Sequence, residues 1–386
     1  MTPLLLLLSL LFAAPVAAQT PTAAEYREDA ESIEGLIRRA YAYPERLPGG
    51  RYALTPRLRE EAARVGDGRS LLRFAERALM LLADHHAITG SSFADSYALV
   101  PSGTGLWIEA QGGIFTVEAI RNPHPDVRAG DRLVAIDGVP TAEAVAAFWR
   151  DLGADPATRD AGFAARVLVA GRRDRERRLI LRRGTAPPYE VEMPALNHTP
   201  RPMSPPLTVS EEGRALRIRI NDRLGDDSIV AAFDAAMARA PPGRLVILDL
   251  TDTPSGGNSN VARAILGWFV DRPRFYQMHN LPAEARETGI GRQWVEQVLP
   301  RPGKRHRGPV RVEVGRWTGS MGEGLAIGFD AIGADVVGTR MAGLLGAIHD
   351  LRLRHSGLVL KLPAERLLTV GGLPREAFVP RRPRRR

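Results

Sequence analysis

Residues 316–333 read RWTGSMGEGLAIGFDAIG and join an apolar strand to an apolar helix through a serine set among glycines. Residues 320–323, SMGE, match the capping box S-x-x-E, in which the serine and the glutamate each satisfy a free backbone amide at a helix start. The helix also begins with Gly322 and Gly324, and each glycine costs roughly 1 kcal/mol relative to alanine inside a helix. A cap alone does not need these glycines, so we expect another part of the chain to approach this backbone closely.

Ser320 has a second interpretation as a nucleophile. A helix N-terminus presents free N–H groups and a partial positive charge, which stabilise an oxyanion at an attacked carbonyl. The amide of Met321 would be the first donor. A second donor is expected from residues 248–267, LDLTDTPSGGNSNVARAILG, where Gly256 and Gly257 leave room for a ligand before a helix begins. Two such loops at the C-terminal ends of parallel strands can face one crevice.

Composition narrows the class of protein. There is no cysteine, so disulfides and thiol chemistry are excluded. The formal charge is +9, and five of these charges come from the arginines of the tail at residues 381–386. We therefore interpret the positive charge as a solvated surface and predict no binding to nucleic acid.

The first 18 residues, MTPLLLLLSLLFAAPVAA, are typical of a signal peptide, and their apolar run is too short for a spanning helix. This predicts a periplasmic or secreted protein without stable membrane insertion.

Periodicity divides the rest of the chain. Apolar residues at i, i+3 and i+4 predict helices between residues 23 and 83. Short strands follow, with one helix near residues 142–153, and then a region in which apolar strands alternate with helices, which predicts a largely parallel sheet. The expected segments are a signal peptide (1–18), a helical domain (19–94), a β-rich domain (95–195), a proline-rich linker (196–208), an α/β core (209–380) and a basic tail (381–386).

The β-rich segment resembles the PDZ domains attached to bacterial proteases through VRAGDRLVAIDGVP, residues 127–140. PDZ domains bind an extended C-terminal peptide by strand addition and hold its carboxylate on backbone amides. The resemblance implies that Gly103, Gly105 and Leu106, in SGTGLWIE, form the carboxylate-binding loop. A purely structural β-domain is the alternative.

The mature chain as a whole resembles the serine peptidases that include the C-terminal-processing peptidases and the tricorn core peptidase. The resemblance covers, in order, the helical cap, the PDZ-like segment, LVILDL with PSGGN, GRWTGSMGEGLA and ADVVGT. It implies an α/β fold with a crotonase/ClpP-like βαβ core, an N-terminal helical cap and an inserted PDZ-like domain. It also implies that Ser320 is the nucleophile, with Met321 and Gly256 or Gly257 donating backbone amides to the oxyanion.

The two branches of this family use different residues as the general base. The C-terminal-processing branch uses a lysine about two dozen residues after the serine, where this chain has Leu344 and Leu345. The tricorn branch uses a histidine from the N-terminal region, and LLADHHAITG, residues 81–90, resembles its Leu-x-Asp-x-His segment, with Asp84 and His86 at the matching positions. Histidine suits the chemistry, because its pKa near 6.5 lets it accept and return a proton around neutral pH. His349 is the alternative base.

A third residue should orient the histidine. By resemblance to the tricorn branch this is Glu376, in VGGLPREAFVP, with Glu365 as the competitor. Glu323 is assigned only to the helix cap. Thr251 stands where the family usually carries an arginine after Asp-Leu, so we do not expect the family's usual geometry of substrate binding at this loop.

These patterns predict an exported serine peptidase that cleaves peptides or unfolded protein chains through an acyl-enzyme. We expect no metal, because adjacent acidic and histidine side chains at residues 84–86 seldom converge on one ion, and no organic cofactor. The alternative is a catalytically inactive protein of the same fold that binds peptides.

Overall fold

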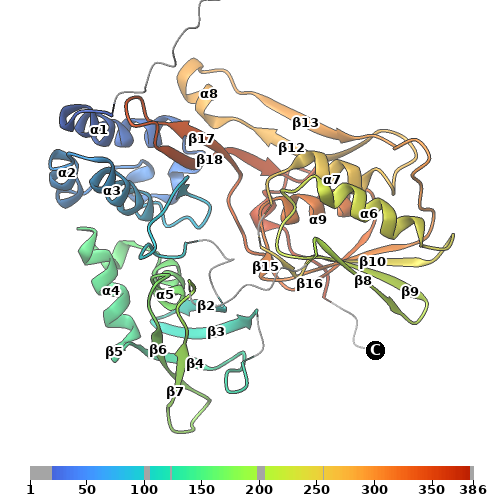
Figure 1. Cartoon of the computed structure of the whole chain (residues 1–386), viewed down its shortest axis with the longest axis horizontal. Coiled ribbons are helices and arrows are strands. Elements are labelled where there is room, and N and C mark those ends of the chain that lie inside the picture. The colour runs from blue at the N-terminus through green and yellow to red at the C-terminus, as the bar shows by residue number, and fades with distance from the viewer. Residues whose placement is uncertain (1–19, 100–104, 122–123, 198–204, 255, 383–386) are drawn as a thin grey trace, which may run out of the picture.

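The computed structural model describes residues 20–99, 105–121, 124–197, 205–254 and 256–382. Within these residues, Figure 1 shows a helical unit and a strand-rich insert on one side of the molecule and an α/β core on the other. The expected signal peptide, residues 1–18, lies outside the described residues. Among the residues described, no helix is both long and apolar enough to cross a membrane.

Three helices form the N-terminal unit where the sequence predicts helices: α1 (Ala23–Ala40), α2 (Pro56–Ala63) and α3 (Gly68–Met80). Each begins at a polar cap, because the side chains of Thr22, Thr55 and Asp67 accept a backbone N–H from the first turn. Their apolar faces pack together with the insert and with β18 (Val359–Leu368) in one hydrophobic cluster. The helical unit and the insert therefore share a core.

The insert is an antiparallel sheet with two helices. Its strands pair in the order β2-β3-β4-β6-β7, with β5 beside β4. The elements are β2 (Leu106–Gln111), β3 (Ile114–Ile120), β4 (Arg132–Ile136), β5 (Val139–Pro140), α4 (Thr141–Asp151), α5 (Ala161–Ala170), β6 (Arg177–Arg182) and β7 (Tyr189–Met193). The prediction of one helix is wrong, because α5 is a second. Its sequence, AGFAARVLVA, is apolar on nearly every side, so it lacks the periodicity that marks an amphipathic helix.

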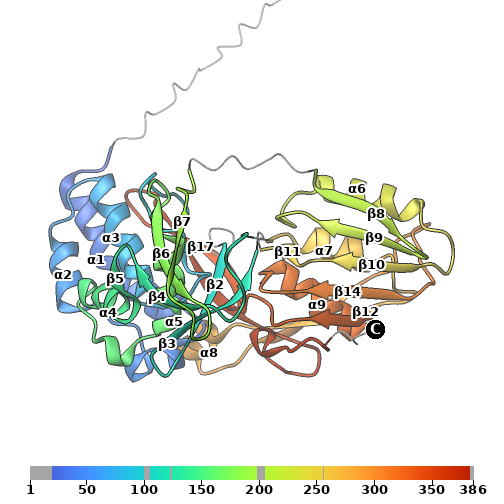
Figure 2. The same ribbon diagram turned by 90° about the horizontal axis from the view of Figure 1, so that it is seen from below.

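The core sheet confirms the predicted parallel arrangement. Its strands run in the order β16-β14-β10-β9-β8, and all neighbours are parallel except β8 and β9. They are β8 (Leu207–Glu212), β9 (Ala215–Ile220), β10 (Leu245–Asp249), β14 (Val310–Val314) and β16 (Asp335–Gly338). The helices are α6 (Ser228–Ala238), α7 (Ser259–Leu266) and α9 (Met321–Ala331). These helices and the strands enclose a second hydrophobic cluster. Figure 2 shows the stacked strands of this core.

A second sheet, which the sequence did not predict, is antiparallel throughout. Its order is β1-β18-β12-β13, with β17 paired to β18. The elements are β1 (Ile88–Thr89), β12 (Arg274–Asn280), α8 (Pro282–Thr288), β13 (Gln293–Val298) and β17 (Ala347–Arg352). Helix α9 contacts β12 of this sheet and β14 and β16 of the core sheet. Because β1 pairs with β18, the segment that follows α3 is held against the C-terminal half of the chain.

Two loops meet at one end of the core sheet. The loop after β10 contains β11 (Asp252–Thr253), and the loop after β14 contains β15 (Trp317–Thr318). The two short strands pair in parallel, with Thr253 opposite Thr318. The hydroxyl of each threonine donates to a carbonyl at the end of a neighbouring strand, Ile220 (2.8 Å) and Leu250 (2.7 Å) respectively. The two loops expected to face one crevice therefore lie side by side.

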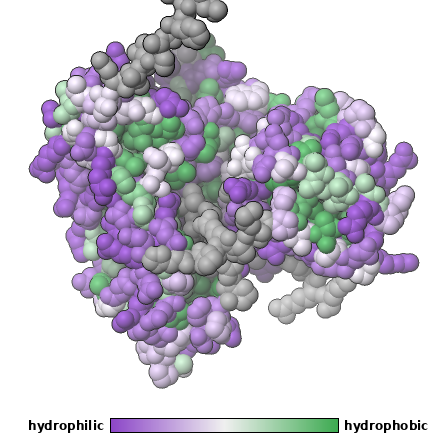
Figure 3. All heavy atoms as spheres, viewed as in Figure 1, coloured by the Kyte–Doolittle hydropathy of each residue, from purple (hydrophilic) through white to green (hydrophobic). Residues whose placement is uncertain are grey.

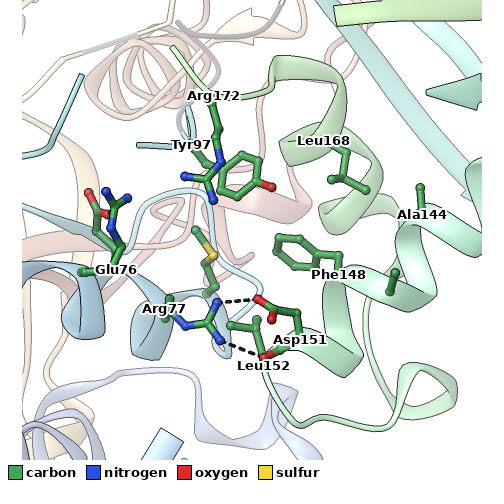
Figure 4. Close-up of a pocket in the computed structure, with 12 residues that line it drawn as sticks. Glu76, Arg77, Tyr97, Ala144, Phe148, Asp151, Leu152, Leu168 and Arg172 are labelled. Atoms are coloured by element: carbon green, nitrogen blue, oxygen red, sulfur yellow. Dashed lines mark hydrogen bonds and ion pairs between the residues drawn. The ribbon is translucent and has the colours of Figure 1, made fainter. Parts of the chain in front are cut away.

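The seam between the helical unit and the insert contains a cavity of about 300 Å³. Figure 4 shows its walls, which come from α3, α4 and α5 and include the apolar side chains of Phe148 and Leu168. Arg77 of α3 donates to the carboxylate of Asp151 (2.5 Å) and to its carbonyl oxygen (2.8 Å) across the seam.

The face of the molecule drawn in Figure 3 is largely hydrophilic, with apolar residues in separate patches.

Candidate active site

Ser320 lies in the turn between β15 and α9, with a backbone φ of 52° and ψ of −117°. Such a conformation costs a residue with a side chain about 1–3 kcal/mol unless the surroundings fix it. Two hydrogen bonds do so: Gly319 donates its N–H to Thr253 (3.0 Å), and Ser320 donates its own to Glu323 (2.9 Å). A Cβ at Gly319 would lie 2.5 Å from the carbonyl oxygen of Pro254, so only glycine fits before the serine.

The glycines that open α9 are closely approached, as the sequence predicts. A Cβ on Gly322 would lie 3.2 Å from the carbonyl oxygen of Thr253 in the neighbouring loop. A Cβ on Gly324 would lie 2.9 Å from the side-chain oxygen of Gln277 on β12. The first turn of α9 is therefore packed between the two loops and the second sheet.

His86 lies beside this serine. Its Nε2 is 3.1 Å from Ser320 Oγ, and its Nδ1 is 2.7 Å from the carbonyl oxygen of Leu345. A carbonyl oxygen can only accept, so Nδ1 carries the hydrogen and Nε2 is left to accept the hydroxyl proton. Burial lowers the pKa of His86 to about 4, against the effect of the bond to Leu345, and the imidazole is therefore neutral at physiological pH.

Asp84 fixes the backbone at His86. Its Oδ1 accepts the N–H of His86 (2.8 Å), and its Oδ2 accepts the hydroxyl of Tyr41 (2.9 Å). Two residues later the chain enters β1, where Ile88 pairs with Lys361 of β18. Contacts from the helical unit and from the second sheet thus bring an N-terminal histidine to a serine more than two hundred residues away in sequence.

The predicted oxyanion donors lie around Ser320. The structure gives the N–H of Met321, the first of α9, no hydrogen-bond acceptor among the described residues. A Cβ on Gly256 would lie 2.7 Å from that nitrogen, so the other loop passes directly beside it. Gly257 has a φ of 130°, and a Cβ there would face open space. The structure thus brings Met321 and Gly256 together beside the serine.

Glu323 does more than cap the helix. Its buried carboxylate accepts the N–H of Ser320 (2.9 Å), of Gly343 (2.9 Å) and of Leu344 (3.1 Å). The guanidinium of Arg375 lies 3.9 Å away. Burial raises the pKa of Glu323 to about 7, while Arg375 and the three amides favour the charged form. One carboxylate therefore ties the serine turn to residues 343–344.

Arg375 fixes the same loop from the other side. Its Nη2 donates to the carbonyl oxygens of Leu344 and Gly346, each at 2.8 Å. The carbonyl between these two belongs to Leu345, which contacts His86. Sequence reasoning missed both residues: Leu345 acts through a backbone atom, and Arg375 stands in an arginine-rich segment where nothing in the sequence distinguishes it.

The prediction that Glu376 orients the histidine does not match this geometry. The carbonyl of Leu345 occupies Nδ1 of His86, and among the described residues no hydrogen bond joins Glu376 to the imidazole. Glu376 Oε2 is buried without a hydrogen-bond partner. Its negative charge adds to the burial that raises the pKa of Asp84 to about 6. The adjacent residue, Arg375, reaches the site instead.

The alternative base and its partner belong to another group. His349 Nε2 is 2.7 Å from Glu365 Oε1, and Glu365 Oε2 is 2.8 Å from Nδ1 of His279 on β12. These residues lie on the second sheet and bind one another. Among the described residues, His86 is the histidine in contact with Ser320.

The residues predicted to bind a peptide carboxylate lie at the start of the insert. Gly103 lies outside the described residues, Gly105 is partly exposed and Leu106 is buried. Strand β2 is at the edge of its sheet, but α5 packs against it, and Arg166 Nη1 donates to the carbonyl oxygen of Ile108 (3.0 Å). The carbonyl of Ile108 on this edge strand is therefore already bonded to Arg166.

Comparisons with known proteins agree with this fold. No protein-family model matches the chain, and no curated protein matches it. Among solved structures, mature CPAF is 16% identical with a TM-score of 0.57, covering 93% of this chain and 92% of that one. The photosystem II D1 C-terminal processing protease is also 16% identical, with a TM-score of 0.55 and 93% of both chains covered. A lipoprotein from Streptococcus agalactiae is 10% identical, with a TM-score of 0.53, over 96% of this chain and 94% of that one.

These likenesses extend over nearly the whole chain, so they concern the arrangement of all three units. At such low identity they establish a shared fold. The predicted resemblance to the C-terminal-processing peptidases is thereby confirmed at the level of the fold.

Titration of the histidines tests the electrostatics of the site. Burial should hold the imidazole of His86 neutral down to a pKa of about 4. For His279, by contrast, burial is outweighed by Glu296 and Glu365, which raise its pKa to about 9. In ¹⁵N NMR spectra recorded against pH, we expect His86 to be neutral and His279 charged at pH 7, with His86→Asn assigning the first signal. A midpoint near 6.5 for His86 would contradict the buried geometry.

Removal of the Glu323 carboxylate should destabilise the fold. Glu323→Ala leaves the amides of Ser320, Gly343 and Leu344 without their acceptor and removes the opposite charge beside buried Arg375, and we expect the free energy of unfolding to fall by about 3–5 kcal/mol. Urea denaturation measures this change. Glu287→Ala, at an exposed position on α8, serves as the control and should shift it by less than about 0.5 kcal/mol. Equal stability of the two variants would show that Glu323 does not hold the loop.

Proposed function

We propose that this chain is an exported serine peptidase that cleaves peptides or unfolded protein chains through an acyl-enzyme. Its crotonase/ClpP-like core carries the reaction, and its PDZ-like insert contacts the substrate. The observation that carries the proposal is the distance of 3.1 Å between Ser320 Oγ and Nε2 of His86. Because Nδ1 donates its hydrogen to the carbonyl of Leu345, Nε2 carries no hydrogen and can accept the proton of Ser320.

In the acylation step, Ser320 Oγ attacks the scissile carbonyl while His86 Nε2 accepts its proton. The negative charge that forms on the carbonyl oxygen is stabilised by the N–H of Met321 at the start of α9, with a second donor from Gly256 or Gly257. His86 then gives its proton to the leaving amine. In the second step, water transfers its proton to His86 and attacks the ester, and Ser320 regains its hydrogen.

The orienting group differs from the one that the sequence predicts. A backbone carbonyl fixes the tautomer and direction of the imidazole as a carboxylate does, but it carries no net charge. The imidazolium that forms during the reaction therefore gains less electrostatic stabilisation. We expect a slower acyl transfer than a triad with a carboxylate at this position would give.

The structural neighbours support the proposal for the substrate. One of them is by name a C-terminal processing protease, and it shares its fold with nearly the whole chain. Export is proposed from the apolar opening residues. The alternative, a peptide-binding protein without catalysis, needs no histidine aligned with the serine, and the Ser320–His86 contact favours the enzyme.

Labelling with a fluorophosphonate tests the reactive pair. Such a probe reacts with a serine whose hydroxyl is activated by a base, so the purified chain should be labelled at Ser320, and Ser320→Ala should abolish labelling. His86→Ala should slow the reaction by about 10²–10⁴-fold. His349→Ala is the matched control, since its imidazole binds Glu365 on the other sheet.

The rate of labelling, followed by mass spectrometry, decides between the proposals. Loss of labelling in His349→Ala but not in His86→Ala would refute the assigned base. A folded wild-type chain that is neither labelled nor able to cleave any unfolded substrate would favour the peptide-binding alternative.

Gly256→Ala tests the oxyanion site. The added methyl would lie 2.7 Å from the nitrogen of Met321 and would cover that N–H. Loss of one oxyanion donor typically lowers kcat about 10²–10³-fold, and we expect a decrease of this size on a peptide substrate. Gly291→Ala, where a methyl meets no atom within 4 Å, should leave kcat unchanged. Full activity of Gly256→Ala would place the oxyanion elsewhere.

A further inference from the structure

We infer that Arg166, on α5 of the insert, is a positioning residue that aligns His86 with Ser320 by acting through His85. The inference rests on the proposed function. Arg166 donates from Nε to His85 Nε2 (2.8 Å) and from Nη1 to the carbonyl oxygen of Ile108 on β2 (3.0 Å). One guanidinium therefore joins the insert to the residue that precedes the proposed base.

These contacts fix the orientation of His85. A guanidinium can only donate, so Nε2 of His85 accepts and Nδ1 carries the hydrogen, which it donates to the carbonyl of Leu99. The ring of Phe163, also on α5, lies 4.8 Å from the imidazole centroid. Burial and the charge of Arg166 lower the pKa of His85 to about 3, so the ring is neutral.

The position of His85 constrains the position of His86, because the two residues are adjacent in the chain. Consecutive Cα atoms are fixed about 3.8 Å apart by a planar peptide bond, so the main chain allows little slack between the two residues. The side chain of His85 is bound to the insert, and that of His86 to Leu345 and Ser320. A shift of Arg166 therefore changes the direction from which the backbone enters His86.

The insert also contacts the chain near the serine. Trp107 on β2 packs edge-on against Trp317, with ring centroids 6.3 Å apart, three residues before Ser320. The guanidinium of Arg166 lies 5.3 Å from the ring centroid of Trp107, and that of Arg316 lies 4.9 Å from it. A continuous packed group thus runs from His85 through Arg166 and Trp107 to the serine turn. It lies where it can set the separation between the two catalytic groups.

The insert is docked by other contacts that do not involve Arg166. Arg77 of α3 binds Asp151 across the seam (Figure 4). Arg159 donates to the carbonyl oxygen of Leu81 (3.0 Å), and the hydroxyl of Thr55 donates to Leu152 (2.6 Å). Loss of Arg166 should therefore leave the insert in place and affect the alignment of His86.

The experiment compares Arg166→Gln with Arg159→Gln, which removes another guanidinium that joins the insert to the helical unit. Inactivation by a fluorophosphonate gives a limiting rate and a half-saturating concentration. We expect Arg166→Gln to lower the limiting rate about 10- to 100-fold without changing the half-saturating concentration, because misalignment affects the reacting atoms. Arg159→Gln should change neither, and Arg166→Lys, which keeps one donor group, should recover part of the loss.

A double substitution tests whether Arg166 acts through His85. His85→Asn can keep a side-chain N–H for Leu99 but is too short to reach Arg166. We expect His85→Asn to lower the limiting rate as Arg166→Gln does, and the double variant to lose no more than either single one. Because His85→Asn breaks the same contact from the other side, it carries the test if Arg166→Gln fails to fold.

The outcomes separate this inference from the proposed function. A wild-type chain labelled at Ser320, together with an Arg166→Gln variant as fast as Arg159→Gln, overturns the inference alone. Losses that multiply in the double variant also overturn it, since the two residues would then act independently. A folded wild-type chain that is not labelled overturns the proposed function and the inference together.

Discussion

The hydrogen bond from Nδ1 of His86 to the carbonyl oxygen of Leu345 is the contact on which the candidate site depends. It fixes the tautomer and turns Nε2 toward Ser320, while burial keeps the imidazole neutral. A carbonyl has no charge to lose or gain, so the tautomer should be maintained at every pH at which the chain is folded and His86 is neutral. Because the carbonyl carries no net charge, it stabilises the imidazolium formed during the reaction less than a carboxylate would.

The carbonyl can orient His86 only if its loop stays in place, and two buried ionisable side chains bind that loop. The carboxylate of Glu323 accepts hydrogen bonds from the backbone N–H groups of Ser320 and of residues 343–344. Arg375 donates hydrogen bonds to the carbonyl oxygens on either side of Leu345. The carboxylate therefore couples the position of the nucleophile to the position of the base's orienting group. The same bonds hold Ser320 in a backbone conformation that a residue with a side chain rarely adopts.

The contribution of the sequence can be judged residue by residue. Helical periodicity and alternating strands predicted the helical unit and the parallel sheet, because these patterns reflect local burial. The glycines around Ser320 predicted close packing there, since a methyl would collide with the neighbouring loop. Helix α5 was missed because it is apolar on nearly every side.

The pairing of β1 with β18 in the second sheet was missed because the two strands are more than two hundred residues apart, and no local pattern marks their pairing. The roles proposed for Ser320 and His86 came from motifs, and the structure places these two side chains in contact. The partner of Nδ1 could not be found in this way. A backbone carbonyl is present at every residue, so its use leaves no trace in the sequence, and the search for an acidic group led to Glu376 beside the arginine that supports the loop.

A crystal structure of the chain inactivated by a fluorophosphonate tests this account most directly. The account predicts phosphorus bonded to Ser320 Oγ, a phosphoryl oxygen within hydrogen-bond distance of the Met321 nitrogen, and Nδ1 of His86 still bound to the carbonyl of Leu345. An imidazole turned to a carboxylate such as Glu376, or a modified serine with no histidine beside it, would contradict the account.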